Sequence, residues 1–237
     1  MDLPQPIPLR TDYSLTRESP FSYRCHGCNR CCHDKVIPVN PYEVARLAET
    51  LGTTTSDVLA HSTTTGGATL ATQADGACVF LGANGCTVHA GRPLACRLYP
   101  LGRQVAGAGP ERFAEVVPHP ESAGVYGQGN TSGDSTVEGW LRSQGAGPYL
   151  AAADRYSAVL SRMIAALTKS RVTVDVLDET APSFGRPAPP PHENWLDMDA
   201  VVARRCAARG EPVPQDVEAK TEIHLAALEE WAARFGA

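Results

Sequence analysis

The sequence has no long apolar run. No stretch of about 18 consecutive apolar residues occurs among its 237 residues, so no membrane-spanning helix is predicted. The first ten residues contain three prolines and lack the apolar core of a secretory signal. No internal repeat is present either. We therefore expect a cytoplasmic protein without membrane partners.

An excess of positive charge is also missing. The chain has 21 Lys and Arg against 26 Asp and Glu, which gives a formal net charge of -5 and a pI of about 5.8. Such a balance provides no general attraction to nucleic acid or to anionic membranes. The expected partner is a small-molecule or protein substrate.

Cysteine is abundant and unevenly distributed. Seven of the eight cysteines fall between positions 25 and 96. Four form the cluster Cys25-x2-Cys28-x2-Cys31-Cys32, and the others are Cys78, Cys86 and Cys96. Cys206 lies far downstream, and we expect it to be a small buried residue of a helix.

These cysteines indicate metal or redox chemistry more than a disulfide scaffold. The local count is odd, two cysteines are adjacent, and no export signal precedes them. Thiolates suit zinc and iron–sulfur clusters, and two cysteines separated by two residues can reach one metal from a single tight turn. Gly27 supplies the permissive backbone that such a turn needs.

The first half of the chain predicts short elements around these cysteines. A helix begins at Pro41, with Asn40 as its cap and Glu43 near its positive end, and Gly52 ends it. A second short helix covers 57–60, capped by Thr55 or Ser56. The turn signal Asn84-Gly85 predicts a hairpin that carries Cys78 and Cys86 on neighbouring strands. The further expected elements are strands at 36–39, 69–73 and 77–81, a helical turn from Pro93 through Cys96 and Arg97, and a strand pair at 101–105 and 112–117 joined by 106–110.

The second half predicts mainly helices. Apolar residues recur at three- and four-residue steps over 148–169, which predicts an amphipathic helix. The residues of this stripe are Tyr149, Ala153, Tyr156, Leu160, Met163, Ile164 and Leu167. Two more helices are expected at 199–209 and 217–235, the latter with an apolar face. Residues 124–133 contain four glycines without a strand before them and are interpreted as a loop.

Together these elements predict an α+β fold. A small cysteine-rich module with short strands is covered by C-terminal α-helices, and helix dominates by residue count. The expected segments are an extended N-terminal arm at 1–20, the metal-binding module at 21–120, the Gly-rich loop and amphipathic helix at 121–186, and a Pro-rich linker with the C-terminal helices at 187–237.

At this point the motifs resemble a known family. Their blocks occur in order: the cysteine cluster, Cys78-Val79-Phe80-Leu81, Gly85-Cys86-Thr87-Val88 and Arg92-Pro93-x2-Cys96-Arg97-x-Tyr99-Pro100. This combination resembles the YkgJ-type CxxCxxCC cysteine-cluster proteins over roughly residues 21–104. The resemblance implies a zinc- or iron-chelating protein. The flagellin lysine methylases resemble the same module joined to other sequence, with an iron–sulfur cluster and S-adenosylmethionine, but this chain has no glycine-rich methyltransferase loop after a strand.

Seven thiols exceed the four that one zinc ion or one four-iron cluster needs. Three are not ligands, or two centres exist, or a polynuclear cluster uses more. One division joins Cys25, Cys28 and one of Cys31 and Cys32 with Cys96 or Cys78. The adjacent Cys31 and Cys32 are expected to point in different directions. Because the triple C-x2-C-x2-C spacing is closer to that of ferredoxins than to zinc ribbons, an iron–sulfur cluster or iron is expected, with zinc as the alternative.

Several neighbours of the cysteines are candidates for contacts with the metal ligands or the substrate. His26, His33 and His89 can ligate or transfer protons, although a surface role suits each of them better. Arg92 and Arg97 flank Cys96 and either bind anions or form structural salt bridges. Tyr99 is expected to pack.

Three functions are compatible with these residues. The first is an iron- or iron–sulfur-dependent oxidoreductase or transferase. The second is an interaction module around structural zinc, and the third is metal storage or delivery.

Overall fold

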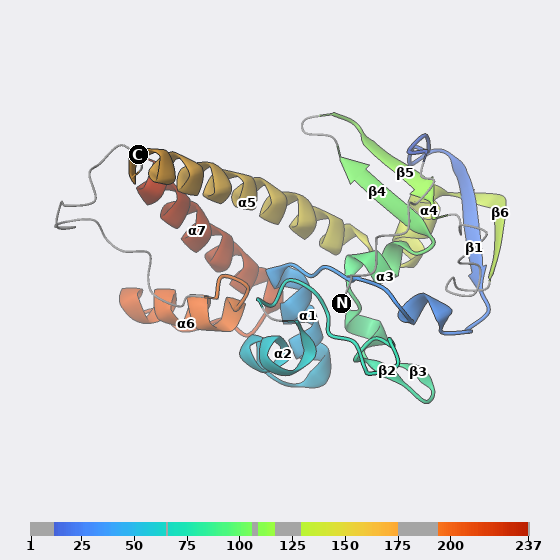
Figure 1. The fold of residues 1–237 in the computed structure, drawn as a ribbon, viewed down its shortest axis with the longest axis horizontal. Helices are drawn as coiled ribbons and strands as arrows, with labels where there is room; N and C mark the ends of the chain where they lie inside the picture. Colours follow the sequence, from blue (N-terminus) through green and yellow to red (C-terminus); the bar gives the residue numbers. More distant parts are fainter. Residues whose placement is uncertain (1–11, 65, 106–108, 117–128, 175–193, 237) are drawn as a thin grey trace. The chain divides into compact units, whose positions relative to one another are not determined.

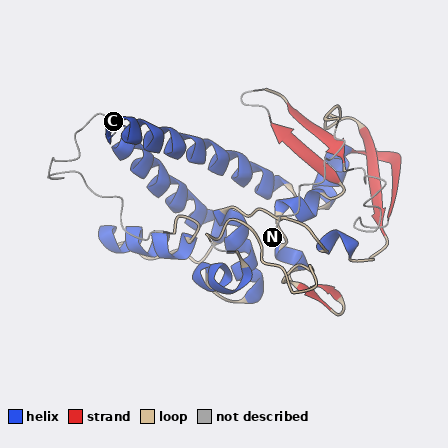
Figure 2. Cartoon of the chain, viewed as in Figure 1, coloured by secondary structure: helices blue, strands red, loops and turns tan. Residues whose placement is uncertain are grey.

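The structure is a computed structural model that describes residues 12–64, 66–105, 109–116, 129–174 and 194–236 (Figure 1). Among these residues, seven α-helices accompany three two-stranded antiparallel sheets (Figure 2). The α+β class with helix in the majority is therefore confirmed. None of the described helices is long and apolar enough to cross a lipid bilayer.

The chain divides into two compact units. We call Met1–Pro38 with Thr69–Leu150 the cysteine unit, because it contains all seven clustered cysteines. The helical unit consists of Val39–Ala68 and Ala151–Ala237. The chain therefore leaves the cysteine unit after its first cysteines and returns with the rest.

Three small sheets build the cysteine unit. Strand β1 (Pro20–Cys25) pairs with β6 (Gly129–Thr136), so that Tyr23 lies opposite Thr131 and Cys25 opposite Gly129. Strand β4 (Leu101–Val105) pairs with β5 (Glu111–Glu115). The shortest pair is β2 (Leu81–Gly82) with β3 (Gly85–Cys86).

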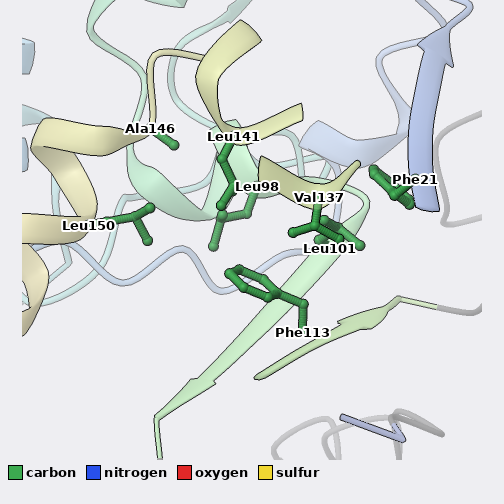
Figure 3. Close-up of a cluster of buried hydrophobic side chains, with 8 residues drawn as sticks. All are labelled: Phe21, Leu98, Leu101, Phe113, Val137, Leu141, Ala146 and Leu150. Carbon is green, nitrogen blue, oxygen red and sulfur yellow. The ribbon is translucent and has the colours of Figure 1, made fainter. Parts of the chain in front are cut away.

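The apolar core of the cysteine unit joins the β1–β6 and β4–β5 sheets to two helices, α3 (Leu94–Leu98) and α4 (Val137–Ser143). Leu98 and Leu141 extend from these helices into one buried cluster that also contains Leu101 of β4 (Figure 3). Phe21 and Phe113 are almost completely buried in the same cluster. Since Leu98 comes two residues after Cys96, burial of the cluster fixes the segment that carries this cysteine.

Five helices form the helical unit: α1 (Pro41–Leu51), α2 (Thr55–Ser62), most of α5 (Gly147–Val174), α6 (Met198–Arg209) and α7 (Val217–Gly236). The Asn40 side chain accepts from the Glu43 amide, and the Glu43 carboxylate accepts from the Asn40 amide. This capping box and the left-handed Gly52 confirm the predicted bounds of α1.

Side-chain contacts join the helices of this unit. Asp197 and Asp199, at the start of α6, accept from the hydroxyl and the amide of Thr55 on α2. Arg155 of α5 forms a two-pronged ion pair with Glu222 of α7. Cys206 is buried, as predicted.

The helix predictions for the second half are confirmed as α5, α6 and α7, but the apolar stripe of α5 differs. Leu160 and Ile164 are exposed, whereas Val159 is buried. The buried face is thus rotated relative to the predicted stripe, because tertiary packing selects the face. The predicted proline-rich linker at 187–191 lies outside the described residues.

Several strand predictions are wrong. No strand forms at 36–39, 69–73 or 77–81, apart from Leu81 at the start of β2. Some of these residues form isolated β-bridges instead. Their backbone groups bond instead across loops, as in the donation from Leu70 to the Ile37 carbonyl. Residues 124–128 are outside the described part, but 129–133 belong to β6, so the loop prediction fails there. All residues of β6 are exposed, and no apolar alternation marks the strand.

Other predictions for the first half hold only in part. Helix α2 exists but is capped by Thr54 rather than by Thr55 or Ser56. The hairpin is confirmed and carries Cys86 on β3, but the placement of Cys78 on its other strand is wrong, because Cys78 precedes β2 and forms only a bridge with Thr72. The helical turn at Cys96 and the pairing of the last two predicted strands are confirmed as α3 and β4–β5.

Candidate metal centre

The N-terminal cysteine cluster begins where β1 ends. Cys25 is the last residue of β1, and its Sγ accepts from the Gly27 amide at 3.3 Å. Gly27 has a φ of 65°, the left-handed conformation that was predicted for this turn. Asn29 is also left-handed and precedes the 3-10 turn η1 (Arg30–Cys32). The chain thus reverses sharply between Cys25 and the adjacent pair Cys31-Cys32.

A second segment is tied directly to this cluster. The Cys78 amide donates to the Cys32 carbonyl at 2.7 Å, and His33 forms a bridge with Ala77. The Thr87 amide and hydroxyl both donate to the Phe80 carbonyl, which closes the β2–β3 hairpin next to Cys86. Backbone pairing therefore sets the positions of Cys78 and Cys86 relative to Cys32.

Cys96 is positioned by its neighbour Arg97. The Arg97 guanidinium is buried and donates to the carbonyls of Ala90, Arg92 and Gln144 and to the Tyr149 hydroxyl. Its acceptors are all neutral groups. Arg97 accordingly joins α3 to the turn before it and to the end of α4, which makes it a structural residue rather than an anion site.

Six of the seven clustered cysteines line one cavity of about 510 Å³, which we call the thiol cavity. They are Cys25, Cys31, Cys32, Cys78, Cys86 and Cys96. Four separate segments of the cysteine unit supply them: the cluster, the loop before β2, β3 and α3. Cys28 is partly buried but is not among the described residues that line this cavity.

Cys31 and Cys32 lie on the same side of the chain, contrary to the expectation for adjacent residues. Their sulfur atoms are 3.9 Å apart. The hydrogen bond from Cys32 lowers the pKa of Cys31 to about 7. The same bond raises the pKa of Cys32, to which burial and the nearby thiols of Cys96 and Cys86 add. The pKa of Cys32 therefore responds to three neighbouring thiols.

Burial also acts on the other polar groups of the cavity. It raises the pKa of Cys78, with a smaller contribution from Cys86. Desolvation, followed by repulsion from Tyr99 and from nearby thiolates, raises the pKa of Tyr23 to about 12. Within the described residues the buried Tyr23 hydroxyl has no hydrogen-bond partner.

Positive charge lies at the same cavity. Lys35 and Arg92 line it, and burial lowers the pKa of each. His89 also lines the cavity, and desolvation together with Arg92 and Arg97 lowers its pKa. Among the described lining residues there is no Asp or Glu. Hard cations such as Ca²⁺ and Mg²⁺ therefore find no carboxylate ligands here.

The other predicted site residues divide between the thiol cavity and other positions. Tyr99 lines the cavity and packs edge-to-face on Tyr23, with ring centroids 6.0 Å apart. His26 is exposed and lines a separate polar depression beside β1 and β6. His33 forms the backbone bridge to Ala77 and does not line the thiol cavity in the described part of the chain.

Sequence reasoning missed other residues of the cavity: Tyr23, Lys35, Trp140 and Gln144. Trp140 and Gln144 come from α4 and its end, more than 40 residues after the last cysteine of the motif. Apolar alternation of Phe21, Tyr23 and Cys25 was an available signal for β1. No local signal could place α4 at the cysteines, because this contact depends on the folded core.

The cavity fits a soft metal by the chemistry of its donors. Thiols are the ligands that zinc and iron–sulfur clusters prefer, and the described lining supplies six. Their positions do not form a closed coordination shell: among the described residues, no three His, Cys, Asp or Glu side chains are grouped to hold one metal ion. The ligands for one ion would therefore come together on binding, as is usual where metal binding and folding are coupled.

Comparison with known proteins agrees with these donors. Residues 24–114 match the model of the CxxCxxCC family, described as "Putative zinc- or iron-chelating domain". The matched stretch contains all seven clustered cysteines. Neither a curated protein nor a solved structure matches the chain.

Proposed function

We propose that the thiol cavity holds a thiolate-ligated iron centre, most simply an iron–sulfur cluster, because residues 24–114 match the model of a "Putative zinc- or iron-chelating domain". The observation that carries this proposal is the convergence of six cysteines on one cavity without carboxylates in its described lining. Four of these thiols, Cys31, Cys32, Cys86 and Cys96, would supply the number of thiolates that such a cluster needs. Cys25 and Cys78 are the remaining donors at the cavity.

With such a centre bound, the residues of the same cavity would hold a substrate for a redox or group-transfer reaction. The cavity volume lies within the usual range of small-molecule sites, about 300–1,000 Å³. Bound iron would supply electron transfer or Lewis acidity. Apolar walls limit access of water, and Lys35 compensates negative charge of the Cys31 thiolate. Reduced thiols of this kind are expected in the cytoplasm.

Structural zinc is the second candidate, because Cys-only sites of four thiolates are also typical of zinc. The two candidates differ in an observable way. Zinc is colourless and redox-inactive, whereas an iron–sulfur cluster absorbs visible light and is accompanied by acid-labile sulfide. The first experiment is therefore anaerobic purification with metal, sulfide and absorption measurements on one sample.

A matched pair of variants localises the metal. Cys32→Ala removes a thiol of the cavity that has three other thiols near it. Cys206→Ala removes the buried cysteine of α6 in the helical unit. We expect the wild-type protein and the Cys206→Ala variant to be brown and to contain several irons per chain. The Cys32→Ala variant should contain little metal. Stoichiometric zinc without iron would exclude the iron centre. Reduced, folded protein that contains no metal at all would exclude both.

A further inference from the structure

Arg92 is held at the thiol cavity by neutral groups. Its Nη2 donates to the Gln144 side-chain oxygen at 2.8 Å, and its Nη1 donates to the His89 carbonyl at 2.6 Å. The His89 Nδ1 lies 3.2 Å from the same Nη1. These contacts fix the plane of the guanidinium without neutralising its charge.

The positive charge of Arg92 is not matched by a carboxylate. Within the described residues, Arg92 has no ion pair, and neither Asp nor Glu lines the cavity. Arg97 adds a second buried guanidinium whose acceptors are also neutral. A partly buried charge costs free energy unless an opposite charge compensates it. A rigid guanidinium in this setting is suited to an oxyanion, which it can bind through two parallel hydrogen bonds.

The wall beside Arg92 is aromatic. Trp140 lies one helical turn before Gln144, the residue that holds Arg92, and both line the cavity. Tyr23 packs edge-to-face on Trp140 at 5.9 Å and on Tyr99 at 6.0 Å. The cavity of about 510 Å³ also exceeds the space that a single metal ion needs. An occupant therefore has room for an apolar body next to the guanidinium.

We propose that the thiol cavity binds a small organic anion, with its carboxylate or phosphate on Arg92 and its apolar body against the aromatic wall of Trp140, Tyr23 and Tyr99. This inference names the substrate class of the cavity that the proposed function describes. It rests on the proposed function only for placing the anion beside a metal. Carboxylate and phosphate share the chemistry that Arg92 recognises, and the experiment separates them.

The test uses isothermal titration calorimetry on the full chain as purified under reducing, anaerobic conditions, with its metal content measured. Benzoate and phenyl phosphate are the anionic probes, and benzyl alcohol is the neutral one. Arg92→Gln should weaken binding of the preferred anion about 10- to 100-fold, the usual effect of losing hydrogen bonds to a charged group. Arg92→Lys, which keeps the charge but loses the fork, should weaken it less. Arg142→Gln is the control, because Arg142 is an exposed arginine of α4, the helix that carries Trp140.

The inference is overturned if benzyl alcohol binds as tightly as the anions, if Arg92→Gln binds them like wild type while its circular dichroism is unchanged, or if neither anion binds at millimolar concentration. Metal content of every sample separates this outcome from failure of the proposed function. Arg92-dependent anion binding by a protein that never takes up metal supports the anion site and contradicts the metal centre. A metal-loaded protein that binds neither anion supports the metal centre and contradicts the anion site.

Discussion

Arg97 of α3 stacks on Tyr149 near the start of α5. The Arg97 Cζ lies 4.0 Å from the centroid of the Tyr149 ring, and Nη2 donates to the Tyr149 hydroxyl at 2.9 Å. Three backbone carbonyls accept the other hydrogen bonds of this guanidinium. One buried side chain thus connects the segment of Cys96 to the end of α4 and the beginning of α5.

Replacement of Arg97 by Ala should destabilise the protein strongly. It leaves buried carbonyls without donors and removes the cation–π contact, and we expect a loss of roughly 3 kcal/mol or more in the free energy of unfolding. Urea unfolding followed by circular dichroism measures this change. Arg142→Ala, at an exposed site of α4, should alter the midpoint little. Equal midpoints for the two variants would contradict the structural role of Arg97.

Gly129 is predicted to be irreplaceable because of Tyr23. A Cβ at Gly129 would overlap the ring and hydroxyl of Tyr23 in the neighbouring strand. At Gly133 in the same strand, a Cβ would meet only Pro20 Cβ at 3.5 Å, an ordinary contact. Gly129→Ala should therefore cost about 1–3 kcal/mol through overpacking and displace Tyr23 from the cavity wall.

The matched variant Gly133→Ala controls for the loss of glycine in β6. Thermal unfolding and metal content of both variants are the measurements. We expect both quantities to fall in Gly129→Ala and to stay near wild type in Gly133→Ala. Similar behaviour of the two variants would show that the contact with Tyr23 does not matter.

His224 should make the stability of the helical unit depend on pH. Its ring is fully buried, with Nδ1 2.9 Å from the Tyr156 hydroxyl oxygen, and desolvation lowers the pKa of His224 to about 4. The unfolded chain, with an ordinary histidine pKa near 6.5, binds more protons between these values. The free energy of unfolding therefore contains the full contribution of His224 above about pH 6.5. This contribution, roughly 3 kcal/mol, is lost as the pH decreases toward 4.

The measurement is urea unfolding of metal-free protein at several pH values between 4 and 7. His224→Gln, which does not titrate, should show a flatter decline than wild type. The comparison matters because carboxylates such as Asp199, whose pKa is lowered by Lys220 against the effect of burial, change stability in the same direction. Identical slopes for wild type and His224→Gln would rule out the contribution of His224.

Metal removal should loosen the cysteine unit selectively. Without metal, the thiols no longer link the cluster, the hairpin and α3, whereas the capping box and ion pairs of the helical unit contain no cysteine. Hydrogen–deuterium exchange with and without a chelator should show faster exchange in 25–32 and 78–98. Exchange in α1, α6 and α7 should change little. A uniform change across the chain would argue against a metal site confined to the cysteine unit.

The sequence alone determined the elements that depend on neighbouring residues. Asn40, Pro41 and Glu43 predict the start of α1, because the cap and its hydrogen-bond partner lie within four residues of each other. Gly27 predicts the left-handed turn inside the cysteine cluster. The cysteine spacing likewise indicates donors for a soft metal, because the softness of thiols and the short spacing between them can both be read from the sequence.

Tertiary structure decided which of these side chains share a cavity. Strand β1 pairs with β6 across more than 100 residues, and the polar sequence of β6 has no apolar alternation to predict it. Arg97 becomes a structural clamp and Arg92 a cavity residue only when Gln144 is brought to both. Such contacts depend on burial of the core around Leu98 and Leu141, which no local pattern specifies. The sequence therefore determines that the donors are thiols, and long-range packing determines which of these thiols line the same cavity.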